Sequence, residues 1–214
     1  EDGSVAILDR VRDKTIAIVR PDGTLAGQLP LEGKGIPEGG GVTSVVVDGK
    51  DVYAEREGGP LVLIGTTDGT KADERTQIPG RPSRDGQFFV TAAVSDRDSG
   101  LMYVAAINRP GLDHRFTRNI KAPAPFPAIV LLDTDKQGII YLAVQVQYGE
   151  ATEDTVVQLL CLEPKQGAII GSSALPANYM PEESFRDFEV LDEGGVIYSF
   201  KTEKGVEFRH YTCP

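Results

Sequence analysis

The sequence predicts an all-β protein made of repeated four-stranded antiparallel units. A short pattern recurs roughly every 50 residues: apolar residues, an Asp, a turn with Gly, an apolar residue and then Tyr. Each repeat also changes from continuous apolar residues to a polar stretch, as a sheet does when its inner strands are buried and its outer edge meets water. The 24 Gly and 14 Pro interrupt the chain too often for long helices. Together these features predict a β-propeller of about five visible blades.

The recurring pattern describes a β-hairpin. Asp and Gly favour the tight turn, because Asp bonds nearby backbone groups and Gly accepts positive φ. The flanking residues are the β-branched, aliphatic and aromatic types that strands prefer. In four repeats a tyrosine occupies the same second-strand position, where we expect it to pack between blades. These residues are Tyr53, Tyr103, Tyr141 and Tyr198.

Aspartates recur at the hairpin turns as well, at Asp48, Asp96, Asp133 and Asp192. We interpret them as turn residues rather than paired catalytic acids. The stretch that begins at Asp133 resembles the start of a calcium loop. The twelfth position of such a loop needs an acid, and Val144 stands there. A hairpin turn is therefore expected at this place.

Further strands complete each unit. Apolar third runs follow the hairpins at residues 15–19, 60–64, 155–162 and 206–211. More polar fourth runs are expected at residues 24–31, 72–78 and 168–175. In the first unit Ala6 stands at the tyrosine position, so we expect this unit to lack its innermost strand.

We expect a single propeller domain over residues 1–214. Its blades are predicted at roughly residues 1–35, 41–80, 86–126, 127–178 and 184–214. The incomplete first unit suggests truncation at the N-terminus and leaves open a further blade upstream of Glu1. A β-sandwich is the alternative all-β architecture, but it does not need such a regular spacing.

The first unit resembles an NHL-type repeat. A strand ends at Asp9, a polar turn and an apolar strand follow, and a turn at Asp22 and Gly23 leads to another strand. The recurring hairpin is similar to that of the wider six-bladed propeller group, which includes gluconolactonase-like enzymes. The resemblance implies the propeller fold and leaves the function open, because one fold hosts many functions.

The composition narrows the classes of partner. With 22 Lys and Arg against 32 Asp and Glu, the net charge is −10, so we expect no nucleic-acid partner, which would need a cationic surface. No apolar run approaches the roughly 18–20 residues that cross a bilayer, and no membrane insertion is expected. A partner would be a protein or a small molecule.

Two cysteines, Cys161 and Cys213, are too few for a disulfide framework. Both fall in the predicted third strands of neighbouring blades. Because stacked sheets lie about 10 Å apart, beyond the usual Cα spacing of a disulfide, we expect two free thiols. The absence of a reducing-compartment motif suggests a periplasmic or extracellular protein.

Catalytic motifs are absent from the sequence. It has no Gly-x-Ser-x-Gly elbow and no CxxC pair, and its only histidines, His114 and His210, fall in strand-like or loop contexts. The glycine-rich residues 33–41 open no helix, so we interpret them as a linker rather than a phosphate cradle. We therefore predict no catalytic residue, no metal ligand and no cofactor.

One basic segment, residues 109–127, stands out in this acidic chain. Its first part carries four of the 22 basic residues, and prolines stiffen its second part. We interpret it as a protruding loop that contacts an acidic partner or ligand. The alternative is a solvated connection between blades. The candidate partner-binding residues are Arg109, His114, Arg115, Phe116, Arg118, Lys121 and Phe126.

The leading functional hypothesis is a non-enzymatic, extracytoplasmic propeller that acts as a binding or scaffold module. The alternative is a metal-dependent hydrolase of the gluconolactonase-like type, whose metal would be held by carboxylates such as Glu55, Asp187 and Glu189. A third hypothesis is one arm of a larger surface assembly.

Overall fold

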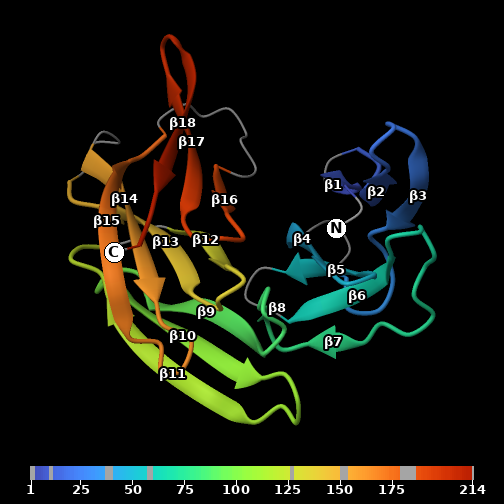
Figure 1. Cartoon of the computed structure of the whole chain (residues 1–214), viewed down its shortest axis with the longest axis horizontal. Helices are drawn as coiled ribbons and strands as arrows, with labels where there is room; N and C mark the ends of the chain where they lie inside the picture. The colour runs from blue at the N-terminus through green and yellow to red at the C-terminus, as the bar shows by residue number, and fades with distance from the viewer. Residues whose placement is uncertain are drawn as a thin grey trace. The chain divides into compact units, whose positions relative to one another are not determined.

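The computed structural model describes residues 3–9, 12–36, 41–56, 60–125, 128–149, 154–178 and 187–213 (Figure 1). Within these ranges the chain forms eighteen β-strands and no α-helix. The all-β prediction is therefore confirmed. The short helical turn that the sequence allows at residues 181–186 lies outside the described residues.

The chain divides into two compact units, Glu1–Arg81 and Pro82–Pro214. The first unit holds two sheets of consecutive antiparallel strands. Sheet 1 consists of β1 (Val5–Asp9), β2 (Thr15–Val19) and β3 (Leu25–Pro30). Sheet 2 consists of β4 (Val42–Asp48), β5 (Asp51–Arg56), β6 (Leu61–Thr66) and β7 (Gln77–Ile78).

Three further sheets follow. Sheet 3 consists of β8 (Arg81–Pro82), β9 (Phe88–Asp96), β10 (Leu101–Asn108) and β11 (His114–Lys121). Sheet 4 consists of β12 (Ala128–Thr134), β13 (Ile140–Gln147), β14 (Thr155–Leu162) and β15 (Ile169–Pro176). Sheet 5 consists of β16 (Phe188–Val190), β17 (Val196–Thr202) and β18 (Gly205–Tyr211).

Each sheet is a meander of consecutive strands, which is the construction of a propeller blade. Five such sheets confirm the predicted blade architecture, although sheets 1 and 5 have three strands among the described residues rather than four. That all five blades form a single domain stays a prediction. The segments predicted as third strands at residues 15–19 and 155–162 coincide with β2 and β14.

The expectation that sheet 1 lacks its innermost strand is wrong. Strand β1 contacts β4, the first strand of sheet 2, and β3 contacts β6, the third strand. Ala6 therefore lies on a first strand, whereas Tyr53, Tyr141 and Tyr198 lie on second strands. The Asp-Gly turns of sheet 1 resemble those of the other sheets. Because of this similarity, the sequence comparison of the repeats matched the first strand of sheet 1 to the strands of the other sheets that contain the repeated tyrosines.

Strand β13 forms the centre of the second unit. The five residues from Ile140 to Val144 are all buried, as their continuous apolar character predicts for a strand covered on both faces. Ile140, Leu142 and Val144 pack in a core with sheet 3, while Tyr141 and Ala143 pack in a core with sheet 5. Alternation along one strand thus joins three sheets into one compact unit.

Tyr53, Tyr141 and Tyr198 lie in the second strands of sheets 2, 4 and 5, as predicted, whereas Tyr103 lies in β10, which follows the short strand β8 and then β9 in sheet 3. Tyr141 and Tyr198 are buried in the core that sheets 4 and 5 share, where Tyr198 stacks on Phe188 at a ring-centroid distance of 4.5 Å. Tyr53 is also buried. Tyr103 is only half-buried, so the expected packing between blades does not extend to it.

The prediction of two free thiols is wrong, because Cys161 and Cys213 form a disulfide. Their Cα atoms lie 6.1 Å apart, within the usual range for this bond. Cys213 follows the end of β18, so the spacing between stacked sheets does not constrain it. The sequence argument failed because it placed both cysteines inside strands.

Candidate functional site

The basic segment from Arg109 onward is not a protruding loop. A turn at residues 109–113 leads into β11, which pairs along its length with β10. The start of the proline-rich part returns to the body of the unit, because Ala122 N–H donates to the Gly100 carbonyl and Gln147 N–H donates to that of Pro125. The predicted partner-binding residues from Arg109 to Lys121 thus sit on a paired strand and the turn before it.

Strand β11 is the edge of sheet 3, so its outer backbone groups have no strand partner among the described residues. Arg118 and Lys121 are exposed on it, and neither makes an ion pair within the described part of the chain. His114 is exposed and its ring nitrogen Nε2 lies 3.0 Å from the hydroxyl of Thr117. This edge, with exposed Arg118, Lys121 and His114, is called the basic edge below.

Three other predicted residues, Arg109, Arg115 and Phe116, do not join this surface. Phe116 is 6% exposed and belongs to the core between sheets 3 and 4, so its ring is not available to a partner as the sequence analysis expected. The guanidinium carbon of Arg115 lies 4.5 Å from the ring centroid of Phe88, and that of Arg109 lies 5.5 Å from that of Phe89. Both arginines therefore stabilise the fold through cation–π contacts.

The last predicted residue, Phe126, lies outside the described residues. His210, which the sequence analysis left as a strand residue, is exposed on β18.

The sequence analysis did not find a charged cluster around Arg84, in the turn between β8 and β9. Arg84 Nη2 lies 2.9 Å from Asp133 Oδ2 and 3.3 Å from Glu189 Oε1. Its Nη1 lies 3.0 Å from Asp192 Oδ1, and Lys136 Nζ lies 2.7 Å from the other oxygen of Asp192. One arginine thus connects residues of β12, β16 and the turn after β16.

Electrostatics stabilise the charged forms in this cluster. Burial acts to lower the pKa of Arg84, but its bonds to Asp133 and Asp192 and the charge of Glu189 outweigh burial and raise it. The hydrogen bond from Lys136, followed by that from Arg84, lowers the pKa of Asp192. Each carboxylate of the cluster forms an ion pair with a cationic side chain of the protein, so the arrangement is suited to joining sheets rather than to acid–base catalysis.

One of the recurring aspartates, Asp133, differs from its interpretation as a turn residue. Asp96 accepts hydrogen bonds from the amides of Asp98 and Ser99 and does serve its turn. Asp133 lies in β12, and Asp135 takes the turn role by accepting from the amides of Gln137 and Ile139. The hairpin turn expected in place of a calcium loop is thus present.

The hydroxyl of Tyr141 links the turn at Asp135 to the turn that precedes β17. Its hydroxyl donates to Asp135 Oδ2 at 3.0 Å and accepts from the amide of Gly195 at 2.8 Å. Asp135 is 1% exposed and Tyr141 is 2% exposed, so these bonds are shielded from water. Burial raises the pKa of Tyr141, the Gly195 amide opposes that shift, and the nearby Asp135 carboxylate adds to it.

The acids considered for a metal-dependent hydrolase are engaged in other contacts. Glu55 forms a two-point ion pair with Arg81, and Glu189 contacts Arg84. Burial acts to raise the pKa of Glu55, but the bond and charge of Arg81 lower it overall. Within the described residues, no group of three or more His, Cys, Asp or Glu side chains is arranged to hold a metal ion.

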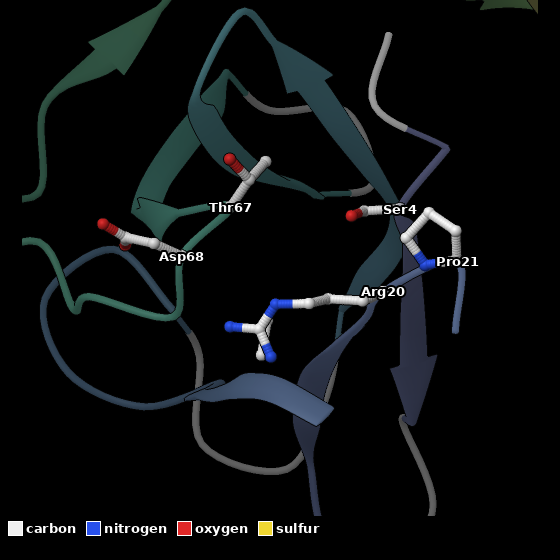
Figure 2. Close-up of a pocket in the computed structure, with 6 residues that line it drawn as sticks. Ser4, Arg20, Pro21, Thr67 and Asp68 are labelled. Atoms are coloured by element: carbon white, nitrogen blue, oxygen red, sulfur yellow. The ribbon is translucent and has the colours of Figure 1, made fainter. Parts of the chain in front are cut away.

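The first unit has a small polar pocket between the β2–β3 turn and the β6–β7 turn (Figure 2). It encloses about 310 Å³ and is lined by Ser4, Arg20, Pro21, Ala26, Thr67 and Asp68. Arg20 donates to the carbonyl of Leu25, and the Thr66 hydroxyl and Thr70 amide lower the pKa of Asp68 to about 2. Its two charged groups are thus already hydrogen-bonded to their own turns.

Glycine is required where these two segments of the first unit meet. A Cβ at Gly27 would lie 2.5 Å from the Cα of Gly69. Gly69 also has a φ of +89°, in the region that favours glycine. The close contact holds strand β3 against the β6–β7 turn and fixes the shape of the pocket.

Comparison with known proteins gives distant matches among solved structures. No protein-family model and no curated protein matches the sequence. Among solved structures, BamB from Moraxella catarrhalis is 12% identical with a TM-score of 0.36, over 98% of this chain and 61% of that one. The computationally designed Ika8 protein is 12% identical with a TM-score of 0.41, over 98% of this chain and 69% of that one.

The WD40 domain of SCAP from fission yeast is 13% identical with a TM-score of 0.33, over 100% of this chain and 56% of that one. The chain thus spans less than two thirds of the length of BamB and of the SCAP chain. In the described residues, no helix has the length and apolar character needed to cross a membrane.

Proposed function

We propose that this chain is a non-enzymatic, extracytoplasmic propeller module that binds an acidic segment of a partner protein at the basic edge. The observation that carries the proposal is the pair of exposed cations Arg118 and Lys121, which make no ion pair within the described residues. In a chain of net charge −10, such cations are a local site of attraction for anionic groups.

The backbone of β11 supports the same proposal. An edge strand offers unpaired N–H and C=O groups, to which an extended peptide can add as a further strand. Exposed Thr117 and Asn119 stand beside the cations and supply additional hydrogen-bonding groups. Main-chain bonds would give affinity and the cations would select acidic residues.

The disulfide between Cys161 and Cys213 supports an extracytoplasmic location, because disulfides persist in oxidising compartments. The NHL-type resemblance is kept as part of this proposal. Its support is the order of strands and Asp-containing turns in sheet 1, which follows the pattern expected from residues 5–25.

The test is the binding of a dye-labelled decaglutamate peptide, measured by fluorescence anisotropy. Reversal of both charges, Arg118→Glu with Lys121→Glu, replaces two attractions by two repulsions and should weaken binding about tenfold. Binding should also weaken as salt rises from about 0.1 M to 1 M, where the screening length falls to about 3 Å.

A matched control keeps the net charge equal. Lys50→Glu with Lys165→Glu reverses two exposed lysines in the turns of sheets 2 and 4. This control should bind decaglutamate nearly as well as the parent chain. Equal losses in the two double variants would show that only net charge matters, and no binding by the parent chain would overturn the proposal.

A further inference from the structure

The outer edge of sheet 5 differs from the basic edge. Strand β18 pairs with β17 on one side and with no strand on its other side among the described residues. In sheet 4 the corresponding third strand, β14, is covered by β15. Figure 1 shows the end of the β17–β18 hairpin, in red, projecting past the other strands of its unit.

The side chains of this edge are unusually apolar for an exposed strand. Phe208 is 76% exposed and Val206 is 55% exposed, and both lie on the same face of β18. Strand β11 protects its edge with Arg118 and Lys121, whereas β18 has no comparable block of one charge sign. An open edge that combines unpaired backbone groups with exposed apolar side chains favours pairing with another strand.

The residues of β18 are complementary to themselves. Phe208 is the central residue of Gly205–Tyr211, with Glu207 before it and Arg209 after it. In an antiparallel pairing of two copies about a two-fold axis at Phe208, Glu207 of each copy lies opposite Arg209 of the other. Opposite charges at directly opposed positions stabilise an antiparallel pair.

The remaining positions are compatible with the same register. The two Phe208 side chains lie opposite each other, as aromatic cross-strand pairs do, and Val206 lies opposite His210. In an antiparallel ladder, a two-fold axis can pass through a hydrogen-bonded or through a non-hydrogen-bonded residue pair. Backbone bonds between the two copies can therefore form whether the N–H and C=O groups of Phe208 point towards the second copy or towards β17.

Glu207 and Arg209 are already positioned for this contact. Arg209 donates to Glu207 Oε2 from Nη2 at 2.7 Å and from Nε at 3.1 Å. Its guanidinium carbon lies 4.0 Å from the ring centroid of Phe200, which holds the side chain against the sheet. Both charged groups stay partly exposed, at 54% for Glu207 and 34% for Arg209.

We propose that the chain self-associates through β18, forming a symmetric dimer in which two three-stranded sheets join into one continuous sheet. The occupant of this edge is a second copy of the chain, and the self-complementary order Glu207, Phe208, Arg209 is what selects it. This proposal is independent of the partner proposed for the basic edge, since it concerns a different sheet.

Charge variants test the proposal. Sedimentation velocity on the 23.0 kDa chain should reveal a dimer with a dissociation constant in the micromolar range. Glu207→Arg places like charges opposite each other, and so does Arg209→Glu, so each single variant should weaken the dimer at least about tenfold. The double swap, with both substitutions in one chain, should restore it.

Mixing the two single variants gives the decisive result. One variant carries two cations at positions 207 and 209 and the other carries two anions, so an equimolar mixture should form heterodimers although neither forms homodimers. A change in the stability of the single chain cannot produce this outcome. Lys165→Glu, which alters the net charge by the same amount as Arg209→Glu, should leave the dimer unchanged.

A measurement on the unmodified chain keeps the test independent of the variants. Amide hydrogen exchange should slow in β18 as concentration rises, while exchange in β11 stays constant. A chain that remains a monomer at about 1 mM would overturn the proposal. A dimer that survives both single substitutions, or a mixture without heterodimers, would also overturn it.

Discussion

Removal of the Tyr141 hydroxyl is the most informative perturbation of the fold. In Tyr141→Phe the ring still fills its place, but the Gly195 amide and Asp135 Oδ2 lose their partner. A buried polar group left without a partner costs about 1–3 kcal/mol, and more when the group is charged. Because both partners are affected, we expect a loss of about 2–4 kcal/mol in the free energy of unfolding.

Urea denaturation measures this loss. With a slope of about 2–3 kcal/mol per molar urea, the midpoint should fall by about 0.7–2 M without a change in slope. Tyr103→Phe is the matched control, because Tyr103 occupies the equivalent strand position and is half-buried. Its free energy of unfolding should change by no more than the roughly 0.5 kcal/mol typical of surface substitutions. Equal midpoints for the two variants would refute the structural role assigned to the Tyr141 hydroxyl.

Three further results are expected. The pKa of Asp68 is lowered in the folded chain to about 2, so this carboxylate contributes stability above its unfolded pKa. The contribution is lost as pH falls from about 4 to 2. Asp68→Asn should therefore remove that part of the acid transition, which is followed by urea midpoints measured across this pH range. Arg84→Met removes one of the two cations that lower the pKa of Asp192, so an NMR titration should find that pKa closer to its ordinary value. Reduction of the disulfide between Cys161 and Cys213, which are 52 residues apart, should lower the free energy of unfolding by about 4 kcal/mol, and an unchanged urea midpoint after reduction would contradict this.

The elements that the sequence predicted correctly depend on local patterns. The buried strand at Ile140–Val144 is visible as a continuous apolar run, and the turn at Asp96 is visible because its side chain bonds amides two and three residues away. Such features need no knowledge of which blades become neighbours. They were therefore sufficient for the fold class and for most strand positions.

Some features were missed because they depend on contacts between residues far apart in the sequence, and β11 was missed for a local reason. The bond between Arg84 and Asp133 joins residues 49 positions apart, and no local pattern marks it. Strand β11 was taken for a loop because charges interrupt its sequence. The apolar residues Phe116 and Ile120 stand an even number of positions apart, and this spacing was a usable signal of one buried face. The disulfide was missed because it depends on where the chain turns after β18.

The central claim is that the basic edge binds acidic protein segments, and mapping of backbone amide shifts by NMR tests it most directly. On addition of unlabelled decaglutamate at low salt, the largest shifts should fall on β11, at and around Arg118 and Lys121, and should disappear in about 1 M salt. Amides of the Arg84 cluster should not move, because its cations are already paired. Shifts spread evenly over the molecule, or concentrated on any sheet other than sheet 3, would contradict the claim.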